Sequence, residues 1–340
     1  MRNLPGYVRG GSPQIEVSSW LGSKQMAVLP VVSSSWKVTD EVDVKVPGSV
    51  EFAVPNEPEW RPLTPDHPLA RFGQQLRVRV NERGEWVTLG RYRLIGCTPS
   101  GDVLRVRGLG LLHILERARL MTSLQTGWVT KRAALDAIVG GILPLSVTAW
   151  GGSLPPRLWE PQTSRLDALW ELLESWPARA YVDDLGVLCV APPFTEEVPL
   201  YTIAEGVDLS GIEPVPDDRD PFNAYVVSTQ PEGGAAPLSV SWGITSGPMS
   251  YHGPYGLNPG FYSSPLLPDD RSVLEDIART MTQRQVRQAH AVDFTVPFDP
   301  RMEAGDQVRV TSPSHGIDGT GRIVSIAHDG IRTSGRVGLA

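Results

Sequence analysis

Glycine and proline recur so often along this chain that they limit the length of every element it can form. The sequence holds 34 glycines and 31 prolines in 340 residues, and they fall between short apolar runs. Glycine adopts backbone conformations that other residues avoid, and proline lacks a backbone donor, so both tend to end helices and strands. This spacing predicts many short strands joined by turns.

The first part of the chain has the pattern of a strand-rich domain. Three alternating or β-branched runs predict strands of a barrel or sandwich, over residues 15–20, 26–38 and 42–54. Five prolines within residues 55–68 exclude a ladder or helix there and predict a surface loop. Apolar and basic residues alternate on both sides of a turn at Gly84, and this pattern predicts a long hairpin over residues 76–96.

Helical patterns mark the middle of the chain. After a strand at 103–106 and a short buried helix, we expect the first domain to close near residue 120. Thr130 is a predicted N-cap for a helix that stops at Gly140, and Ser164 begins a capping box for a second helix.

The last part of the chain returns to strands. Two apolar runs around residues 183–186 predict a hairpin that still belongs to the middle of the chain. A strand at 223–228 then precedes a long excursion, 229–268, rich in Gly, Pro, Ser and Tyr. Asp269 and Asp270 cap a predicted helix over 272–289. Strands are expected over residues 292–296, 306–311, 321–328 and 335–339.

These elements divide the chain into three parts. We predict a mainly β fold in which two tube-like barrel or sandwich domains, residues 1–120 and 201–340, flank a small α/β module, residues 121–200. The N-terminus lacks the apolar region of a signal peptide, and no apolar stretch is long enough to span a membrane, so we expect synthesis in the cytoplasm.

No catalytic, metal or cofactor constellation is found in the sequence. Cys97 and Cys189 have no CxxC spacing and no nearby histidine, and we interpret both as small buried hydrophobes. The six histidines form no HExxH pattern, no GxSxG elbow occurs, and the start of a GxGxxG pattern at Gly108 ends on His113 instead of glycine. We therefore predict that the chain is not an enzyme and needs no cofactor.

Three groups of residues allow a functional as well as a structural interpretation. Acidic pairs could serve a glycosidase, but each falls in a turn or cap where Asp is favoured locally: Asp183–Asp184, Asp217–Asp218 and Asp269–Asp270. Four tryptophans could stack on sugars, but we favour packing for them: Trp150, Trp159, Trp170 and Trp176. The net charge of −7 argues against general nucleic-acid binding, although a local basic stripe exists at Arg77, Arg79, Arg91 and Arg93.

One segment near the end resembles a known family. After the strand FNAYVVS (222–228), an insert and a helix, the chain continues FTVPFDPRMEAGDQVRVTSPSHGIDGTGRIVSIAHDG. This order resembles the closing barrel of bacteriophage tail-hub (baseplate-hub) proteins, including late-control-protein-D-like and siphophage minor tail proteins. The hairpin at 76–96 followed by DVLRVRGLGLLHILERARL is similar in kind to the first domain of these hubs.

The resemblance implies a structural protein of the virion. Hubs of this family are homotrimers in which each subunit contributes two tube-like barrels, so that three chains match a sixfold tail tube to a threefold tip and close the lumen before DNA ejection. The implied partners are the distal tail protein or tube ring, the tape-measure protein and other tail-tip or receptor-binding proteins. DNA would only pass through the lumen, without a membrane span in the chain.

Two other functions remain open on the sequence. A carbohydrate-binding or cell-surface adhesion module could use an aromatic segment that includes Tyr251, Tyr255, Phe261 and Tyr262. A cell-wall-degrading enzyme could use dispersed acids, or a histidine with Cys97 or Cys189. Glycan binding by the isolated chain would favour the first alternative, and turnover of purified peptidoglycan would favour the second.

Overall fold

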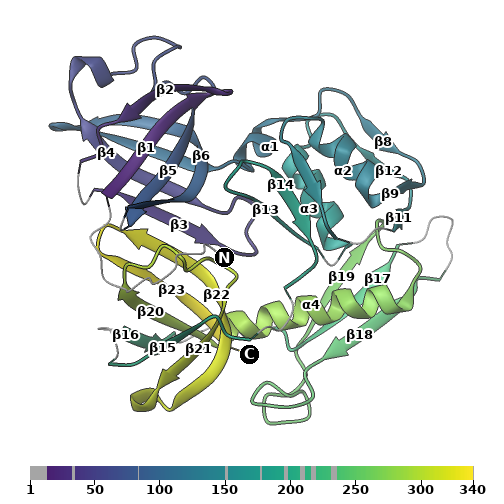
Figure 1. Cartoon of the computed structure of the whole chain (residues 1–340). Helices are drawn as coiled ribbons and strands as arrows, with labels where there is room; N and C mark the ends of the chain where they lie inside the picture. Colours follow the sequence, from purple (N-terminus) through teal and green to yellow (C-terminus); the bar gives the residue numbers. More distant parts are fainter. Residues whose placement is uncertain are drawn as a thin grey trace.

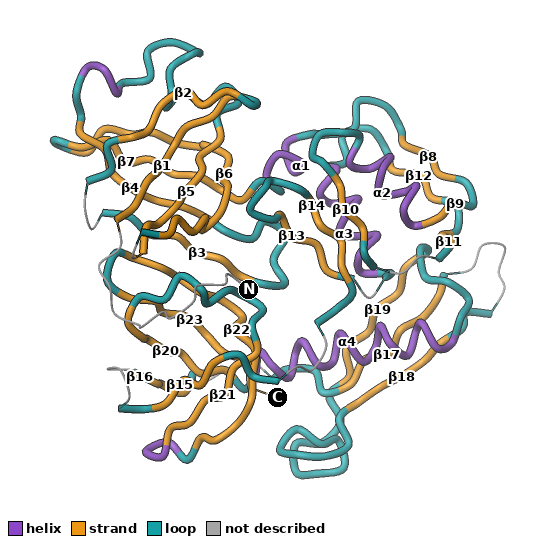
Figure 2. Tube along the Cα trace, in the orientation of Figure 1, coloured by secondary structure: helices purple, strands orange, loops and turns teal. Residues whose placement is uncertain are grey.

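The structure is a computed structural model that describes residues 14–32, 35–82, 84–149, 152–176, 178–194, 198–206, 211–215, 220–230 and 236–339. Figure 1 shows three regions: a large twisted sheet along one side, an α/β module beside its N-terminal half, and a long helix over a small sheet below that module. The mainly β class predicted from the sequence is confirmed (Figure 2). No described helix is long and apolar enough to cross a membrane.

The N-terminal half of the large sheet contains seven strands in the order β3-β4-β7-β6-β5-β1-β2. They are β1 (Gln14–Leu21), β2 (Lys24–Leu29), β3 (Lys37–Glu41), β4 (Ser49–Pro55), β5 (Gln75–Glu82), β6 (Glu85–Ser100) and β7 (Val103–Gly110). Alternation along each strand buries one face, so that Val17, Phe52 and Val78 lie in a shared core. The predicted hairpin is β5–β6, with Gly84 at a φ of 90°.

Two N-terminal predictions differ in extent from the structure. The run at 42–54 forms a strand only from Ser49, because residues 42–48 make a turn in which Asp43 takes a φ of 65°. The long run at 26–38 is likewise divided, since it supplies the end of β2 and the start of β3.

The α/β module has its own core. Its helices are α1 (His113–Arg117), α2 (Lys131–Val139) and α3 (Arg165–Glu174), and its short strands are β8 (Leu124–Thr126), β9 (Val129–Thr130), β10 (Leu145–Val147), β11 (Ser153–Leu154), β12 (Arg157–Trp159), β13 (Arg179–Val182) and β14 (Leu188–Ala191). The predicted caps form: the Thr130 hydroxyl accepts from the Ala133 amide at 3.2 Å, and the Ser164 hydroxyl accepts from the Leu166 amide at 3.1 Å.

The C-terminal half of the large sheet contains β15 (Tyr201–Ala204), β16 (Gly211–Pro214), β20 (Ala291–Pro297), β21 (Gln307–Ser312), β22 (Ile317–Asp329) and β23 (Arg332–Leu339). The order is β16-β20-β23-β22, with β21 also on β22 and β15 on β21. Val296, Val310 and Ile323 lie in the core of this half.

The two halves join through backbone pairing. The end of β22, from Ser325 to Asp329, pairs antiparallel with β3, so all 13 strands belong to one sheet. Phe298 follows β20 in the C-terminal half but is fully buried in the core of the N-terminal half, where its ring packs edge-on against Trp36. The halves are therefore joined by a ladder and by a shared side chain.

The excursion predicted at 229–268 is partly regular structure. It contributes β18 (Ser239–Gly243) and β19 (Pro259–Ser264), which pair on either side of β17 (Ala224–Thr229). Helix α4 (Arg271–Ala289) covers one face of this sheet, and the Asp270 carboxylate caps it by accepting from the Ser272 amide at 2.9 Å. The prediction of an irregular excursion was wrong for these strands because few of their residues are apolar.

Candidate assembly surfaces

The candidate nucleophiles lie in settings that suppress reactivity. Cys97 and Cys189 are half-buried instead of buried as predicted. Burial raises the pKa of the Cys97 thiol, and burial followed by the Asp183 carboxylate raises the pKa of the Cys189 thiol. A raised pKa keeps a thiol protonated and weakens it as a nucleophile. The described residues contain no cluster of three or more His, Cys, Asp or Glu that could hold a metal ion.

One serine does contact both a carboxylate and a histidine, although no sequence motif marks it. The Ser312 hydroxyl donates to Glu205 Oε2 and lies 2.8 Å from His315 Nδ1. Hydrogen bonds from Ser314 and Ser312 lower the pKa of the Glu205 carboxyl. A hydrolytic triad requires the imidazole between the hydroxyl and the carboxylate. Here the hydroxyl lies between the other two groups, so the arrangement is that of a capped turn.

The acidic pairs have structural roles where the structure describes them. Asp183 Oδ1 accepts hydrogen bonds from the amides of Leu185 and Val187, at 2.9 and 2.8 Å, and so shapes the β13–β14 turn. Hydrogen bonds from Ser272 and Val273 lower the pKa of the Asp270 carboxyl, as expected of an N-cap. The pair Asp217–Asp218 lies outside the described residues.

The tryptophans of the module serve packing. Trp159 and Trp176 are buried in the module core, and the Trp159 indole donates to Glu171 at 2.8 Å. The Trp170 indole donates to the carbonyl of Lys45 at 3.3 Å and so connects the module to the N-terminal half. Trp150 lies outside the described residues. No open platform for sugar stacking arises from the three described rings.

The aromatic segment of the adhesion hypothesis is mostly engaged within the fold. The Tyr251 ring contacts the His252 ring at a tilted angle with 4.1 Å between ring centroids, and the Tyr255 hydroxyl donates to the carbonyl of Pro221 at 2.7 Å. Burial, followed by the Glu174 carboxylate, raises the pKa of Tyr262. Of the four residues only Phe261 is an exposed aromatic, with 77% of its surface accessible.

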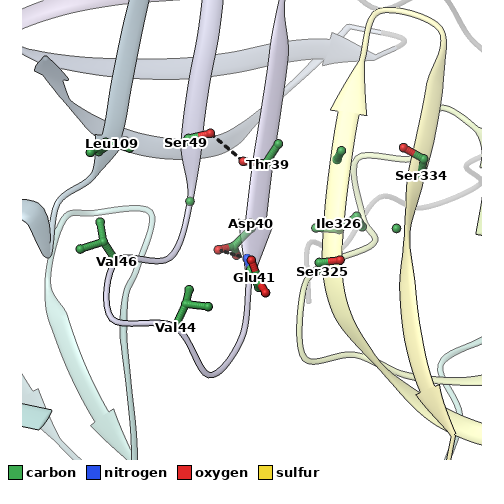
Figure 3. A pocket seen from close by; sticks show the side chains of 13 residues that line it. Thr39, Asp40, Glu41, Val44, Val46, Ser49, Leu109, Ser325, Ile326 and Ser334 are labelled. Carbon is green, nitrogen blue, oxygen red and sulfur yellow. Dashed lines mark hydrogen bonds between the residues drawn. The ribbon is translucent and has the colours of Figure 1, made fainter. Parts of the chain in front are cut away.

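A cavity of about 420 Å³ lies along the joint between the two sheet halves. Figure 3 shows β3 and its turn on one side and β22 and β23 on the other, with the Thr39 and Ser49 hydroxyls 2.7 Å apart. Its lining combines hydroxyl and aliphatic side chains with the carboxylates of Asp40 and Glu41. Such a lining can bind water or a polar group but offers no activated nucleophile.

A second cavity, of about 540 Å³, lies where both halves, the module and α4 meet. The Phe194 ring lies between two guanidinium groups on this lining, 4.2 Å from that of Arg179 and 4.3 Å from that of Arg322. Arg284 of α4 forms an ion pair with Asp43 at 2.8 Å. These contacts hold the module and α4 against the large sheet.

The basic stripe predicted from the sequence lies on the sheet face that points away from the core of the N-terminal half, and Arg91 also lines the second cavity. Arg77 and Arg91 are directly opposite each other on β5 and β6, and Arg93 lies opposite Gln75. Arg79 pairs with Glu16 of β1, and Arg91 Nε donates to the carbonyl of Asp184 at 3.0 Å. The β13–β14 turn therefore contacts one end of the stripe.

The surface also offers open edges and exposed apolar side chains. In the described ladder, the large sheet ends at β2 on one side and β16 on the other. Several large apolar residues are more than 60% exposed: Leu63, Phe72, Met121, Trp128, Leu185, Val198, Leu257, Phe261 and Ile331. Unpaired edges and exposed apolar groups are typical of surfaces that associate with other chains.

Comparison with known proteins gives the same architecture. No family model and no curated protein matches the sequence. Among solved structures, the chain is similar to a tail protein from Neisseria meningitidis MC58, with 17% identity, a TM-score of 0.64, and coverage of 95% of this chain and 96% of that one. The chain has the fold of phage tail proteins.

Two more structures support this fold. The 43 kDa tail protein of prophage MuSo2 from Shewanella oneidensis is 13% identical, with a TM-score of 0.68 and coverage of 95% and 98%. Prophage tail protein gp18 from Listeria monocytogenes EGD-e is 13% identical, with a TM-score of 0.59 and coverage of 95% and 94%. The resemblance found in the last third of the sequence is thus confirmed at the level of the fold, across nearly the whole chain.

Proposed function

We propose that the chain is a structural subunit of a phage tail tip, a hub that assembles as a homotrimer in the virion. The observation that carries this proposal is the match of its fold to tail proteins over 95% of its length. We assign residues 1–120 and 201–340 as two tube-like domains and residues 121–200 as the module between them. Separate hydrophobic cores in the two halves of the large sheet support the two tube-like domains, and the core of the module starts at Leu111, within the first range.

In this proposal the function is assembly rather than catalysis. Three copies with two tube-like domains each match the sixfold tail tube to a threefold tip and close its lumen until DNA ejection. The open edges and exposed apolar residues meet sister subunits, the distal tail protein or tube ring, the tape-measure protein and receptor-binding proteins. The protonated thiols and the capped-turn arrangement of Ser312 support a non-enzymatic role.

The native mass of the purified chain tests this proposal. Mass photometry, followed by electron microscopy of any rings, measures the oligomeric state of the chain alone and with other tail components. We expect a threefold ring. A chain that stays monomeric with those components present would contradict the hub.

A second candidate, an adhesion module of the tail tip, is favoured by one observation. Phe261 projects from the sheet face opposite α4, in a row with Val226 and Ser241. An exposed ring on a flat strand face can stack on a sugar. Binding of the monomer to a glycan array, lost in Phe261→Ala, would support this role, whereas the hub predicts no such binding.

A further inference from the structure

The outer face of five N-terminal strands carries more arginine than its own carboxylates balance. The register of β4, β5, β6 and β7 places six arginines on this face: Arg77, Arg79, Arg91, Arg93, Arg105 and Arg107. The same face of β1 and β4 carries Glu16 and Glu51, which pair with Arg79 and Arg107. We call the surface formed by these six arginines the arginine face.

The arginine face is strained electrostatically in the single chain. Arg77 and Arg91 are cross-strand neighbours of like charge, an arrangement that is destabilising on a sheet. Burial and then the charges of Arg79 and Arg91 lower the pKa of Arg77 by more than Asp184 and Glu16 raise it, and burial and then Arg117 lower the pKa of Arg93. The Nε atoms of Arg77 and Arg79 are buried without a hydrogen-bond partner in the described structure. These groups are suited to additional anions.

The chain itself carries the complementary charge in its other part. Residues 1–120 hold 16 Lys and Arg against 12 Asp and Glu, a net charge of +4, whereas residues 121–340 hold 15 against 26, a net charge of −11. In the edge strand β16, exposed Glu213 lies directly opposite Asp293 of β20, so two carboxylates are cross-strand neighbours. Only Asp293 has an arginine partner among the described residues, Arg336 at 2.8 Å.

We propose that the arginine face of one copy docks on the acidic β16–β20 edge of a second copy. The contact joins two different surfaces, as a closed ring requires. It gives an arginine partner to Glu213, which has none among the described residues, and it relieves the repulsion between Arg77 and Arg91. Arginine suits this role because its planar group binds carboxylates in two places and is weakly hydrated. This inference rests on the proposed hub and names the surfaces through which its copies meet.

A protein partner fits the observations better than nucleic acid. Two of the six arginines already bind carboxylates, and the whole chain has a net charge of −7, which repels a phosphate backbone at long range. A second copy brings its acidic part towards the basic part of the first, so the overall charge distribution favours the approach.

The dissociation constant for self-association, measured by analytical ultracentrifugation at low and high salt, tests the proposal. The arginine variant is Arg93→Glu with Arg105→Glu, and the acidic-edge variant is Glu213→Lys. The matched control is Arg132→Glu with Arg271→Glu, which makes the same charge change at exposed helical sites. Circular dichroism melts check that each variant folds.

We expect each interface variant, and 0.5 M salt, to raise the dissociation constant by about tenfold or more, while the control stays near wild type. If the wild type forms a trimer and none of these changes weakens it, the arginine face is not the interface, and the hub proposal still stands. A wild type that is monomeric under every condition would instead remove the hub, and the inference with it. Binding of a short DNA duplex by the arginine face, in place of self-association, would also overturn it.

Discussion

The two halves of the large sheet differ in how many of their surface arginines have carboxylate partners. In the C-terminal half, each of three exposed arginines forms an ion pair with an aspartate at about 3 Å: Arg309 with Asp318, Arg336 with Asp293, and Arg332 with Asp329. In the N-terminal half, six arginines share a face with two glutamates. Arg93 and Arg105 on that face have no carboxylate partner among the described residues.

This difference separates what folding needs from what assembly needs. Both halves bury alternating apolar residues and are connected by one ladder, so neither depends on surface charge to form its core. Exposed ion pairs contribute about 0 to 1 kcal/mol each, too little to decide the fold. Arg93 and Arg105, which lack a carboxylate partner among the described residues, therefore have no evident role within one chain, which supports a role between chains.

The largest expected effect concerns the residue that both halves share. Phe298→Ala removes a fully buried ring from the N-terminal core together with its edge-on contacts to Trp36 and His328. We expect the free energy of unfolding to fall by about 3 to 5 kcal/mol in urea denaturation, because a large cavity remains.

Phe261→Ala is the control, since its ring is 77% exposed and its loss should change stability by less than about 0.5 kcal/mol. A loss below about 1 kcal/mol for Phe298→Ala would show that the halves fold without their shared core. The N-terminal and C-terminal halves of the large sheet would then be two domains that fold independently.

A second prediction concerns a buried cation, Lys131, that has no carboxylate partner among the described residues. Lys131 is 4% exposed, its Nζ lies 5.0 Å from the centre of the Trp176 ring, and burial lowers its pKa from 10.5 to about 8. Between these values the unfolded chain binds more protons, so stability rises with pH from about 8 to 10.5, whereas below pH 8 the full cost of the charge remains.

Lys131→Met should therefore stabilise the protein at pH 7 by about 2 to 3 kcal/mol. It should also remove the increase in stability that Lys131 causes between about pH 8 and 10.5. Denaturation of both proteins at pH 7 and pH 10 measures the difference, and Lys24→Met, at an exposed site, is the control. Equal stability of Lys131→Met and wild type at pH 7 would show that an unpaired cation costs little even when buried. The argument from the arginine face would then lose its physical basis.

Local signals in the sequence predicted much of this fold. The caps at Thr130, Ser164 and Asp270 and the turn at Gly84 depend on neighbouring residues, and all four form. The strands β18 and β19 were missed because their serines, glycines and proline resemble loop sequence.

The pairing between the two sheet halves and the full extent of the arginine face could be identified only from the structure. β3 and β22 lie about 280 residues apart, and no local pattern specifies that they pair. The sequence did indicate the stripe of Arg77, Arg79, Arg91 and Arg93 through its alternation on β5 and β6. Arg105 and Arg107 could be added only from the register of β7, where a bulge near Gly96 shifts the pairing.

A smaller effect is expected from the paired charges of the C-terminal half. Asp318→Asn removes the carboxylate that Arg309 contacts through two nitrogens, each at 3.0 Å, while both side chains remain more than half exposed. We expect a loss of about 0.5 kcal/mol in unfolding free energy at low salt, and less at 0.5 M salt. A loss above about 2 kcal/mol would mean that surface charge does determine the fold of this half.

The smallest change in unfolding free energy is expected for a substitution of Arg93 in the isolated chain. This measurement decides whether the arginine face contributes to folding or to assembly. Arg93→Gln removes a half-buried charge that lies near Arg117 and lacks a carboxylate partner among the described residues. Its unfolding free energy should stay within about 0.5 kcal/mol of wild type, or rise slightly as repulsion is relieved. Arg309→Gln, which breaks the ion pair with Asp318, is the matched control and should fall slightly. If Arg93→Gln destabilised the monomer more than Arg309→Gln, the arginine face would be part of the fold, and its charge excess would no longer indicate a partner.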